Sequence, residues 1–341
     1  MNTQPPSPPP AAPVVQVVVL NYRTAAMTLH ATAAALAAME GIAGGITIVD
    51  NDSADGSEER LRAAVAANGW AGRVQVLQAG RNGGFGAGNN VAIRAGLPGG
   101  RRPDFVYALN SDAFPERDAI AALLAHMAAH PDCGLAGSLT RDDTGAVQHS
   151  AFRFHSAAGE FEGAARTGPI TRLLHRSAVP LPVPERACAV DWVAGASVLM
   201  RTAMLDQTGL FDEDYFLYYE ETDLCRRAVA AGWRTWFVPE SRVVHIGSVS
   251  TGVGARKRMP RYWFDSRLRY FVRHHGHAYA LGATAARAAG LALWQARRAV
   301  TGQAPADPER FLRDLLAHHA RALLAGARRR RRGAGGDGVP Q

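Results

Sequence analysis

Short apolar runs alternate with longer segments of helical character along the first third of the chain, and this alternation restricts the fold more than any other feature. Runs of β-branched and other apolar residues, which are typical of strands, occupy residues 14–20, 46–50, 74–77 and 104–110. Segments typical of helices lie between them, at residues 24–40, from Ser57 onward, and at 89–96. This β-α-β-α order predicts an α/β fold with a mostly parallel sheet flanked by helices.

The rest of the chain predicts a less regular second half and a helical end. Residues 140–190 contain four prolines without a clear periodicity, so we interpret them as a long insertion. Strand character returns at residues 192–200, 233–239 and 242–247, with a short helix at 224–232. We therefore expect a disordered Pro-rich tail at 1–13, an α/β domain at 14–255 with halves at 14–113 and 114–255, and a helical, Arg-rich extension at 256–341.

The net charge of +8 is unevenly distributed. Residues 256–341 hold 18 Lys and Arg against 5 Asp and Glu, a net charge of +13. Residues 1–255 hold the other 20 basic and 25 acidic residues, a net charge of −5. A basic nucleic-acid-binding protein more often spreads its cations over the folded domain, so the sequence favours a chain that binds no nucleic acid.

Three features of the sequence indicate the cellular location of the protein. The three cysteines are far apart and form no CxxC motif, which argues against a disulfide scaffold or a zinc site. Residues 1–13 lack the basic and apolar regions of a signal peptide, and arginines interrupt the apolar stretch at 278–300. We therefore expect a cytoplasmic location.

Polar residues stand at the ends of the predicted strands, where parallel sheets bind their ligands. Asp50 ends the second run, where its carboxylate could accept hydrogen bonds from a base or a ribose. Arg81 and Asn82 open the glycine-rich segment 81–90, which could place backbone amides at a phosphate. A flexible turn with a helix cap explains this segment equally well.

The fourth run ends in Asn110-Ser111-Asp112. A carboxylate at this edge could ligate a hard divalent cation that bridges a diphosphate, although the tripeptide alone is also an ordinary turn. His245 follows a later apolar run. It is either structural or, if it lies near Asp112, a contact to a metal or a phosphate.

Three carboxylates, at Glu220, Glu221 and Asp223, stand beside four aromatic residues just before a predicted helix. Adjacent carboxylates raise each other's pKa, and aromatic surroundings of low dielectric add to this effect. The cluster therefore predicts a general base that works near neutral pH. Favourable interaction of acids with a helix dipole would explain one or two of the carboxylates, but not the aromatic residues.

Taken together, these motifs resemble the inverting, GT-A-fold glycosyltransferases of family 2, especially the bacterial rhamnosyltransferase-like branch. The resemblance extends over about residues 14–275, through VVVLNY (17–22), VDNDSADGS (49–57), GRNGGFGAGNN (80–90), LNSDA (109–113), GASVLMRTAML (195–205) and FDEDYFLYYEETDLCRRAVAAGW (211–233). It implies a GT-A, Rossmann-like fold and transfer of a sugar from a nucleotide-sugar to a hydroxyl of a glycan or lipid-linked acceptor in cell-surface polysaccharide synthesis. The branch suggests dTDP-rhamnose as the donor.

The resemblance also implies roles for single residues. A donor nucleotide site would comprise Asn21, Asp50, Arg81, Asn82, Asn110 and Ser111. Mg²⁺ or Mn²⁺ would be held by Asp112, the matching acid of a DxD motif in which Asn110 replaces the other acid, assisted by His245. Glu221 aligns with the catalytic Asp of the ED motif and follows Glu220, while Asp223 stays an alternative base.

The C-terminal extension predicts a membrane contact. Segment 311–332 places apolar residues at helical spacing before the arginines at 328–332, which suits an anionic membrane surface better than a merely solvated helix end. We expect peripheral attachment to the inner face of the cytoplasmic membrane.

Two other classes stay open at this point. A nicotinamide-dependent oxidoreductase would need GxGxxG after the first strand, where NYRT stands instead. A noncatalytic nucleic-acid-binding protein would leave the carboxylates and aromatics without a role.

Overall fold

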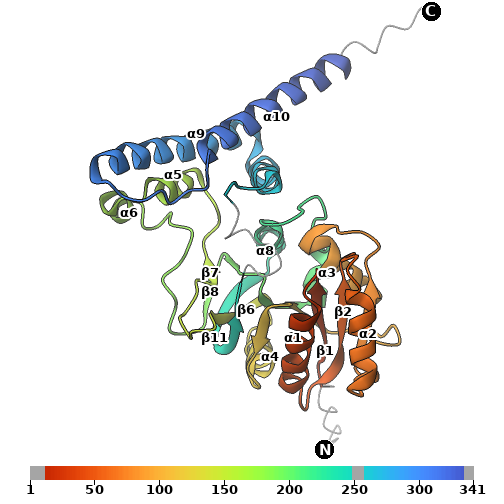
Figure 1. Ribbon diagram of the computed structural model, residues 1–341. Helices are drawn as coiled ribbons and strands as arrows, with labels where there is room; N and C mark the ends of the chain where they lie inside the picture. Colours follow the sequence, from red (N-terminus) through yellow and green to blue (C-terminus); the bar gives the residue numbers. More distant parts are fainter. Residues whose placement is uncertain (1–11, 248–256, 334–341) are drawn as a thin grey trace, which may run out of the picture.

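The computed structural model describes residues 12–247 and 257–333, with side chains as far as Ala325 (Figure 1). Almost all of the predicted disordered tail at 1–13 lies outside the described residues. The strands and helices of the first third form in the order that the alternation of the sequence predicts, although some of their boundaries differ.

A mixed sheet lies in the lower half of the molecule as drawn, below the C-terminal helices (Figure 1). Its strands are β1 (Val14–Asn21), β2 (Ala43–Asp50), β3 (Val74–Gln78), β4 (Phe105–Asn110), β5 (Ala113–Pro115), β6 (Cys133–Arg141), β8 (Cys188–Val190), β10 (Ser197–Arg201) and β11 (Arg234–His245). They lie in the order β3-β2-β1-β4-β10-β6-β11-β5, and β8 pairs with β11. The first four are mutually parallel, whereas β10 is antiparallel to both of its neighbours. The direction of strand addition reverses between β1 and β4, which opens a crevice at their carboxyl ends.

Helices cover both faces of the sheet. On one face, α1 (Ala25–Ala38), α2 (Ser57–Ala67) and α4 (Ala119–Ala129) share a buried apolar cluster with the strands. On the other face, α3 (Gly84–Ala95), α7 (Thr202–Thr208) and α8 (Glu220–Ala230) share a second cluster. Val17 and Val18 of β1 belong to different clusters and are both fully buried, which explains why this strand is apolar throughout.

Residues 140–190 contain more regular structure than their prolines suggest. β7 (Ala151–Phe152) pairs with β9 (Trp192–Val193), and two helices follow β7, namely α5 (Ala157–Ala165) and α6 (Gly168–Leu173). α5 begins where the Ser156 hydroxyl accepts a hydrogen bond from the Gly159 amide at 3.1 Å, an ordinary N-cap.

The C-terminal extension consists of α9 (Arg261–Thr301) and α10 (Phe311–Gly333), and α9 bends at Gly276, where φ is 82°. α5 packs closely on α9, because a Cβ atom at Gly290 would lie 2.6 Å from the Phe161 carbonyl oxygen. Arg267 of α9 and Glu160 of α5 form a buried ion pair at 2.8 Å. No helix within the described residues is both long enough and apolar enough to cross a membrane.

Candidate active site

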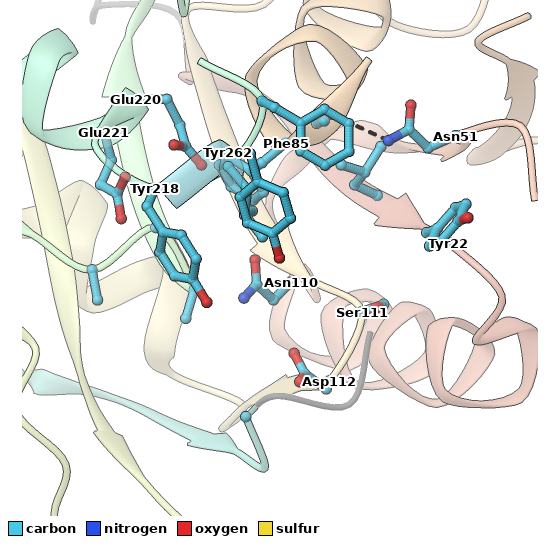
Figure 2. A pocket seen from close by; sticks show the side chains of 18 of the residues that line it. Tyr22, Asn51, Phe85, Asn110, Ser111, Asp112, Tyr218, Glu220, Glu221 and Tyr262 are labelled. Carbon is cyan, nitrogen blue, oxygen red and sulfur yellow. Dashed lines mark hydrogen bonds between the residues drawn. The ribbon is translucent and has the colours of Figure 1, made fainter. Parts of the chain in front are cut away.

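A cavity of about 670 Å³ opens at the carboxyl ends of β1 and β4, at the crevice that the strand order creates. Tyr22 and Asn51 line it just beyond β1 and β2 (Figure 2). Asn110, the last residue of β4, lines it together with Ser111 and Asp112, which follow that strand. The second half of the chain closes the other side through the start of α8 and the segments around it. The structure therefore brings residues from both predicted halves of the α/β domain to one cavity.

Asp50 and Asn21 lie behind the cavity wall and do not line it. Both are buried, and the Asn21 amide donates to the Asp50 carboxylate at 2.6 Å. Asp50 also accepts from the Ser53 hydroxyl at 2.5 Å and from the Gln78 amide at 3.1 Å. These bonds fix the turn that carries Asn51 into the cavity.

The glycine-rich segment divides between the cavity and the surface. Asn82 lines the cavity, and its oxygen accepts from the Asn51 amide at 3.0 Å and from the Gly84 backbone amide at 3.1 Å. Arg81 lies outside the cavity, largely exposed, and pairs with Glu213 at 3.4 Å. The structure thus brings Asn82 together with the strand-end residues but leaves Arg81 apart from them.

Asp112 and His245 both line the cavity, and the pairing of β5 with β11 brings them close, because His245 lies opposite Ala113, the residue after Asp112. Nε2 of His245 lies 3.4 Å from Oδ1 of Asp112 and 3.4 Å from Nδ2 of Asn110. Gln148 orients the imidazole through a contact of 3.3 Å to Nδ1. Two ligands in adjacent octahedral positions around Mg²⁺ would be about 3 Å apart, so the geometry suits a divalent cation.

The remaining lining supports this fit. No Arg or Lys lines the cavity among the described residues, so a bound diphosphate would find no cationic side chain there. The described residues also contain no group of three or more His, Cys, Asp or Glu that could bind a metal by themselves. A cation at Asp112 and His245 would therefore need oxygens from a phosphate or from water, which is how Mg²⁺ is often held.

Glu220 and Glu221 face the cavity from the first turn of α8, opposite the strand-end residues (Figure 2). Burial, and then the neighbouring Glu221, raise the pKa of Glu220 well above its ordinary value. Burial also raises the pKa of Glu221, against the opposing effect of the backbone amides of Glu221, Gly195 and Thr222. The Oε2 atoms of Glu220 and Glu221 are both buried, and neither has a hydrogen-bond partner among the described residues. A pair of this kind can take a proton from a bound hydroxyl group.

Asp223, the alternative base, points away from the cavity. Its side chain is fully buried and accepts from Arg227 Nε at 2.7 Å and from His274 Nε2 at 2.8 Å. Burial alone would raise the pKa of Asp223, but the His274 hydrogen bond and the Arg227 charge outweigh it and lower the pKa. A carboxylate saturated by donors in this way is a poor proton acceptor, so the geometry favours Glu221.

The motifs of the sequence do not point to several residues of the cavity. Tyr262 comes from α9, in the extension that the sequence predicts to be separate from the α/β domain, and it lies beside Tyr218 over the cavity (Figure 2). Phe85 lines the cavity from α3, where it approaches Gly195. The aromatic residues before α8 were a signal for Tyr218, but no local pattern marks Tyr262.

Comparison with known proteins agrees with this arrangement. The sequence profile described as "Glycosyltransferase like family 2" matches residues 10–266. An N-acetylglucosaminyl-diphospho-decaprenol L-rhamnosyltransferase from Mycobacterium tuberculosis is 30% identical over 245 residues, which cover 68% of this chain and 76% of the relative. Rhamnosyltransferase WbbL from Escherichia coli is 26% identical over 193 residues, or 56% of this chain and 70% of the relative.

Among solved structures, the mannosyltransferase PcManGT from Pyrobaculum calidifontis, in complex with GDP-Man and Mn²⁺, is similar with a TM-score of 0.55. The similarity covers 94% of this chain and 81% of that one at 17% identity. It confirms the predicted α/β, GT-A-like fold with C-terminal helices.

Proposed function

The chain belongs to glycosyltransferase family 2, and from this premise we propose that it transfers L-rhamnose from a nucleoside diphosphate sugar, dTDP-rhamnose, to a hydroxyl of a lipid-linked glycan acceptor. The names of the relatives support the sugar and the acceptor class. One observation of the structure carries the proposal: the buried Glu220 and the partly buried Glu221 face an aspartate–histidine pair across one cavity at the sheet edge. Family membership excludes the oxidoreductase and the noncatalytic nucleic-acid-binding protein as alternatives.

The reaction is a single displacement with inversion. Glu221 takes the proton of the acceptor hydroxyl, whose oxygen attacks the anomeric carbon opposite the leaving nucleoside diphosphate. Mg²⁺ or Mn²⁺, held by Asp112 and His245, would supply neutralising charge at the diphosphate. Asn51, Asn82, Asn110 and Ser111 offer polar side chains to the nucleotide on the strand-end side. Asp50 and Asn21 support the turn that carries Asn51 into the cavity.

Tyr218 and Tyr262 extend the cavity on the side of the carboxyl pair. Their aromatic rings offer apolar faces on which a sugar ring can pack, next to the carboxyl that accepts the proton. We assign this side of the cavity to the acceptor and the strand-end side to the donor.

The substitution Glu221→Gln tests the proposal. We expect turnover with a nucleotide-sugar and a lipid-linked acceptor to fall by about 10²–10⁴-fold, because the amide accepts no proton. Binding of dTDP with Mg²⁺ or Mn²⁺, measured by calorimetry, should change little, since Glu221 lies on the acceptor side. Glu59→Gln is the matched control, because Glu59 is an exposed residue of α2, and this variant should behave as the unsubstituted protein. Near-normal turnover of the Glu221 variant would refute the assignment of the base.

We also place the protein at the inner face of the cytoplasmic membrane, where a lipid-linked acceptor is found. α10 carries the exposed Leu316 and, about two turns later, the exposed Leu323 and Leu324. The helix runs outward from the rest of the fold toward the C-terminus (Figure 1). The arginine side chains at 328–332 lie outside the described residues, although the helix continues through them. Exposed leucines followed by arginines suit an anionic leaflet.

A further inference from the structure

The first half of α9 lies along the segment that carries the reactive carboxyls. We call residues 211–223 the carboxylate segment; it ends in the first turn of α8. The α9 residues that contact it include those at positions 262, 266, 269 and 273, spaced four, three and four apart. Residues at this spacing share one face of a helix, so a single face of α9 contacts the beginning, the middle and the end of the carboxylate segment.

The middle of the carboxylate segment contacts the start of α9. The Tyr262 ring lies 5.3 Å from the Phe216 ring and 6.3 Å from the Tyr218 ring, between centroids. The Ser266 hydroxyl donates to the Leu217 carbonyl oxygen at 3.0 Å. These contacts restrain the backbone between the two ends of the segment.

Ion pairs fix both ends. Near the beginning, Asp212 accepts from Arg269 at 2.8 Å and contacts Arg273. At the end, Asp223 accepts from His274 Nε2 at 2.8 Å, and Arg273 Nε lies 3.3 Å from the same carboxylate oxygen. Arg273 therefore contacts both ends of the carboxylate segment.

The backbone of the segment needs such restraint. Tyr218 and Tyr219 have φ values of 72° and 71°, in the left-handed region that side chains other than glycine seldom adopt. Strained backbone of this kind persists when the surrounding structure determines it, and it is found at functional sites. Here it immediately precedes Glu220 and Glu221, so relaxation of the two tyrosines would reorient both carboxyls.

We infer that His274 and Arg273 are positioning residues for the transfer reaction: they hold Asp223, and through it the first turn of α8, so that Glu221 faces the cavity. This inference rests on the proposed function, in which Glu221 is the base. Asp223 lies two residues after Glu221 in the same turn, and its fully buried carboxylate would lose a principal donor with His274. The C-terminal extension thus contributes to catalysis through this contact as well as through Tyr262.

His274→Ala is the test. We expect kcat to fall by about 10- to 100-fold, because small displacements of a catalytic group have large effects on rate. The KM for the nucleotide-sugar and the affinity for dTDP should stay within about twofold, since no donor-side residue moves. His274→Gln keeps a donor near the position of Nε2 and should restore most of kcat. His277→Ala is the matched control, because His277 is an exposed histidine on the same helix.

A destabilising control separates positioning from general loss of structure. His319→Ala removes the 3.0 Å contact to Thr284 between α10 and α9, away from the carboxylate segment. If both variants lower the melting temperature by the same amount, kcat should still be lower in His274→Ala than in His319→Ala. Equal kcat values for these two variants, wild-type kcat in His274→Ala, or no recovery in His274→Gln would each overturn the inference.

Amide hydrogen exchange gives a readout that does not require turnover. Peptides covering 217–224 should exchange faster in His274→Ala than in His277→Ala, and unchanged exchange would overturn the inference. If the proposed function were wrong, the result would differ: the unsubstituted protein would transfer no sugar, whatever the rate of amide hydrogen exchange at the start of α8.

Discussion

At the scale of single residues, Glu220 and Glu221 are neighbours with unequal surroundings. Glu220 is 3% exposed, and its pKa is raised well above the ordinary value by burial and by Glu221. Glu221 is only partly buried, and backbone amides, including that of Gly195, counteract the effect of burial on its pKa. The pKa of Glu220 is thus raised well above its ordinary value, whereas backbone amides partly offset the rise at Glu221. We therefore expect Glu220 to keep its proton more readily than Glu221, which leaves Glu221 the better proton acceptor of the two.

The substitution Glu220→Gln tests this assignment through stability. A carboxyl whose pKa is raised in the folded state contributes stability that is fully present below its unfolded pKa, near 4.5, and is lost as pH rises through the folded pKa. The unsubstituted protein should therefore lose stability relative to Glu220→Gln as the pH rises above about 4.5, because the amide of the variant stays neutral. Thermal unfolding should show a melting-temperature advantage of the variant that grows with pH. An advantage independent of pH would contradict the assignment.

Activity of the same variant gives a second readout. Because glutamine resembles a protonated glutamate, Glu220→Gln should keep turnover within about tenfold at pH 7.5, whereas Glu221→Gln should not. If Glu220→Gln were as inactive as Glu221→Gln, then Glu220 would take part in proton transfer.

Asp50 shows how far single residues could be predicted. Its place at the end of a strand follows from the apolar run before it, and the structure places it there. Its carboxylate bonds to Asn21, Ser53 and Gln78, however, while the next residue, Asn51, lines the cavity. The sequence predicts the strand end, but the choice among neighbouring polar side chains depends on their orientations. A direct contact between Asp50 and the nucleoside stays a prediction.

At the scale of elements, the glycine-rich segment shows why helix boundaries were harder to predict than helix positions. The sequence predicts a helix only from residue 89, after most of the glycine-rich segment 81–90, whereas α3 begins at Gly84. Its first amides are satisfied by groups from outside the helix, since Gly84 donates to Asn82 and Phe85 donates to the Phe216 carbonyl oxygen at 3.0 Å. Tertiary contacts thus override the low helix propensity of glycine.

Gly84→Ala tests the contact between α3 and the carboxylate segment. Gly84 has a φ of 87°, and a Cβ atom there would lie 1.8 Å from the Phe216 carbonyl oxygen. The backbone must move, so we expect a loss of unfolding free energy on the order of 2–4 kcal/mol and reduced turnover.

Gly99→Ala is the matched control, because Gly99 has a φ of 82° and no atom within 4 Å of the added Cβ. It should lose only about 1 kcal/mol from the left-handed conformation itself. Urea denaturation of both variants measures the difference, and equal losses would show that the contact with Phe216 is not tight.

At the scale of the whole molecule, the sequence predicts the helical extension but not its place in the site. The contact between Arg269 and Asp212 joins residues 57 positions apart, and such a contact leaves no periodic signal in the sequence. Contacts between distant residues also explain part of the uneven distribution of charge along the sequence. Arg267, Arg269 and Arg273 of the extension pair with acids of the −5 portion, so part of the +13 is neutralised within the fold. The predicted boundary at residue 255 marks a change in the charge of the sequence, but α9 contacts residues that precede this boundary.

The arginines at 328–332 can be tested for membrane binding without removal of α10. Truncation before α10 would remove Phe311 and Leu315, which are buried against Phe264 and Leu291, and would thus damage the fold. Substitution of the arginines at 328–332 by glutamine leaves this packing intact. We expect it to weaken co-sedimentation with vesicles containing anionic lipid by an amount that shrinks as salt rises, since each arginine near such a surface contributes about 1 kcal/mol.

The exposed leucines should contribute a part of membrane binding that salt does not screen. Leu323→Ser with Leu324→Ser removes two apolar side chains that are 45% and 62% exposed, and it should weaken binding at every salt concentration. Val229→Ser changes an apolar side chain of α8 that is 48% exposed, and it should leave binding unchanged. If neither the leucine nor the arginine substitutions reduced co-sedimentation, the extension would serve the active site alone, through Tyr262 and the α9 contacts to the carboxylate segment.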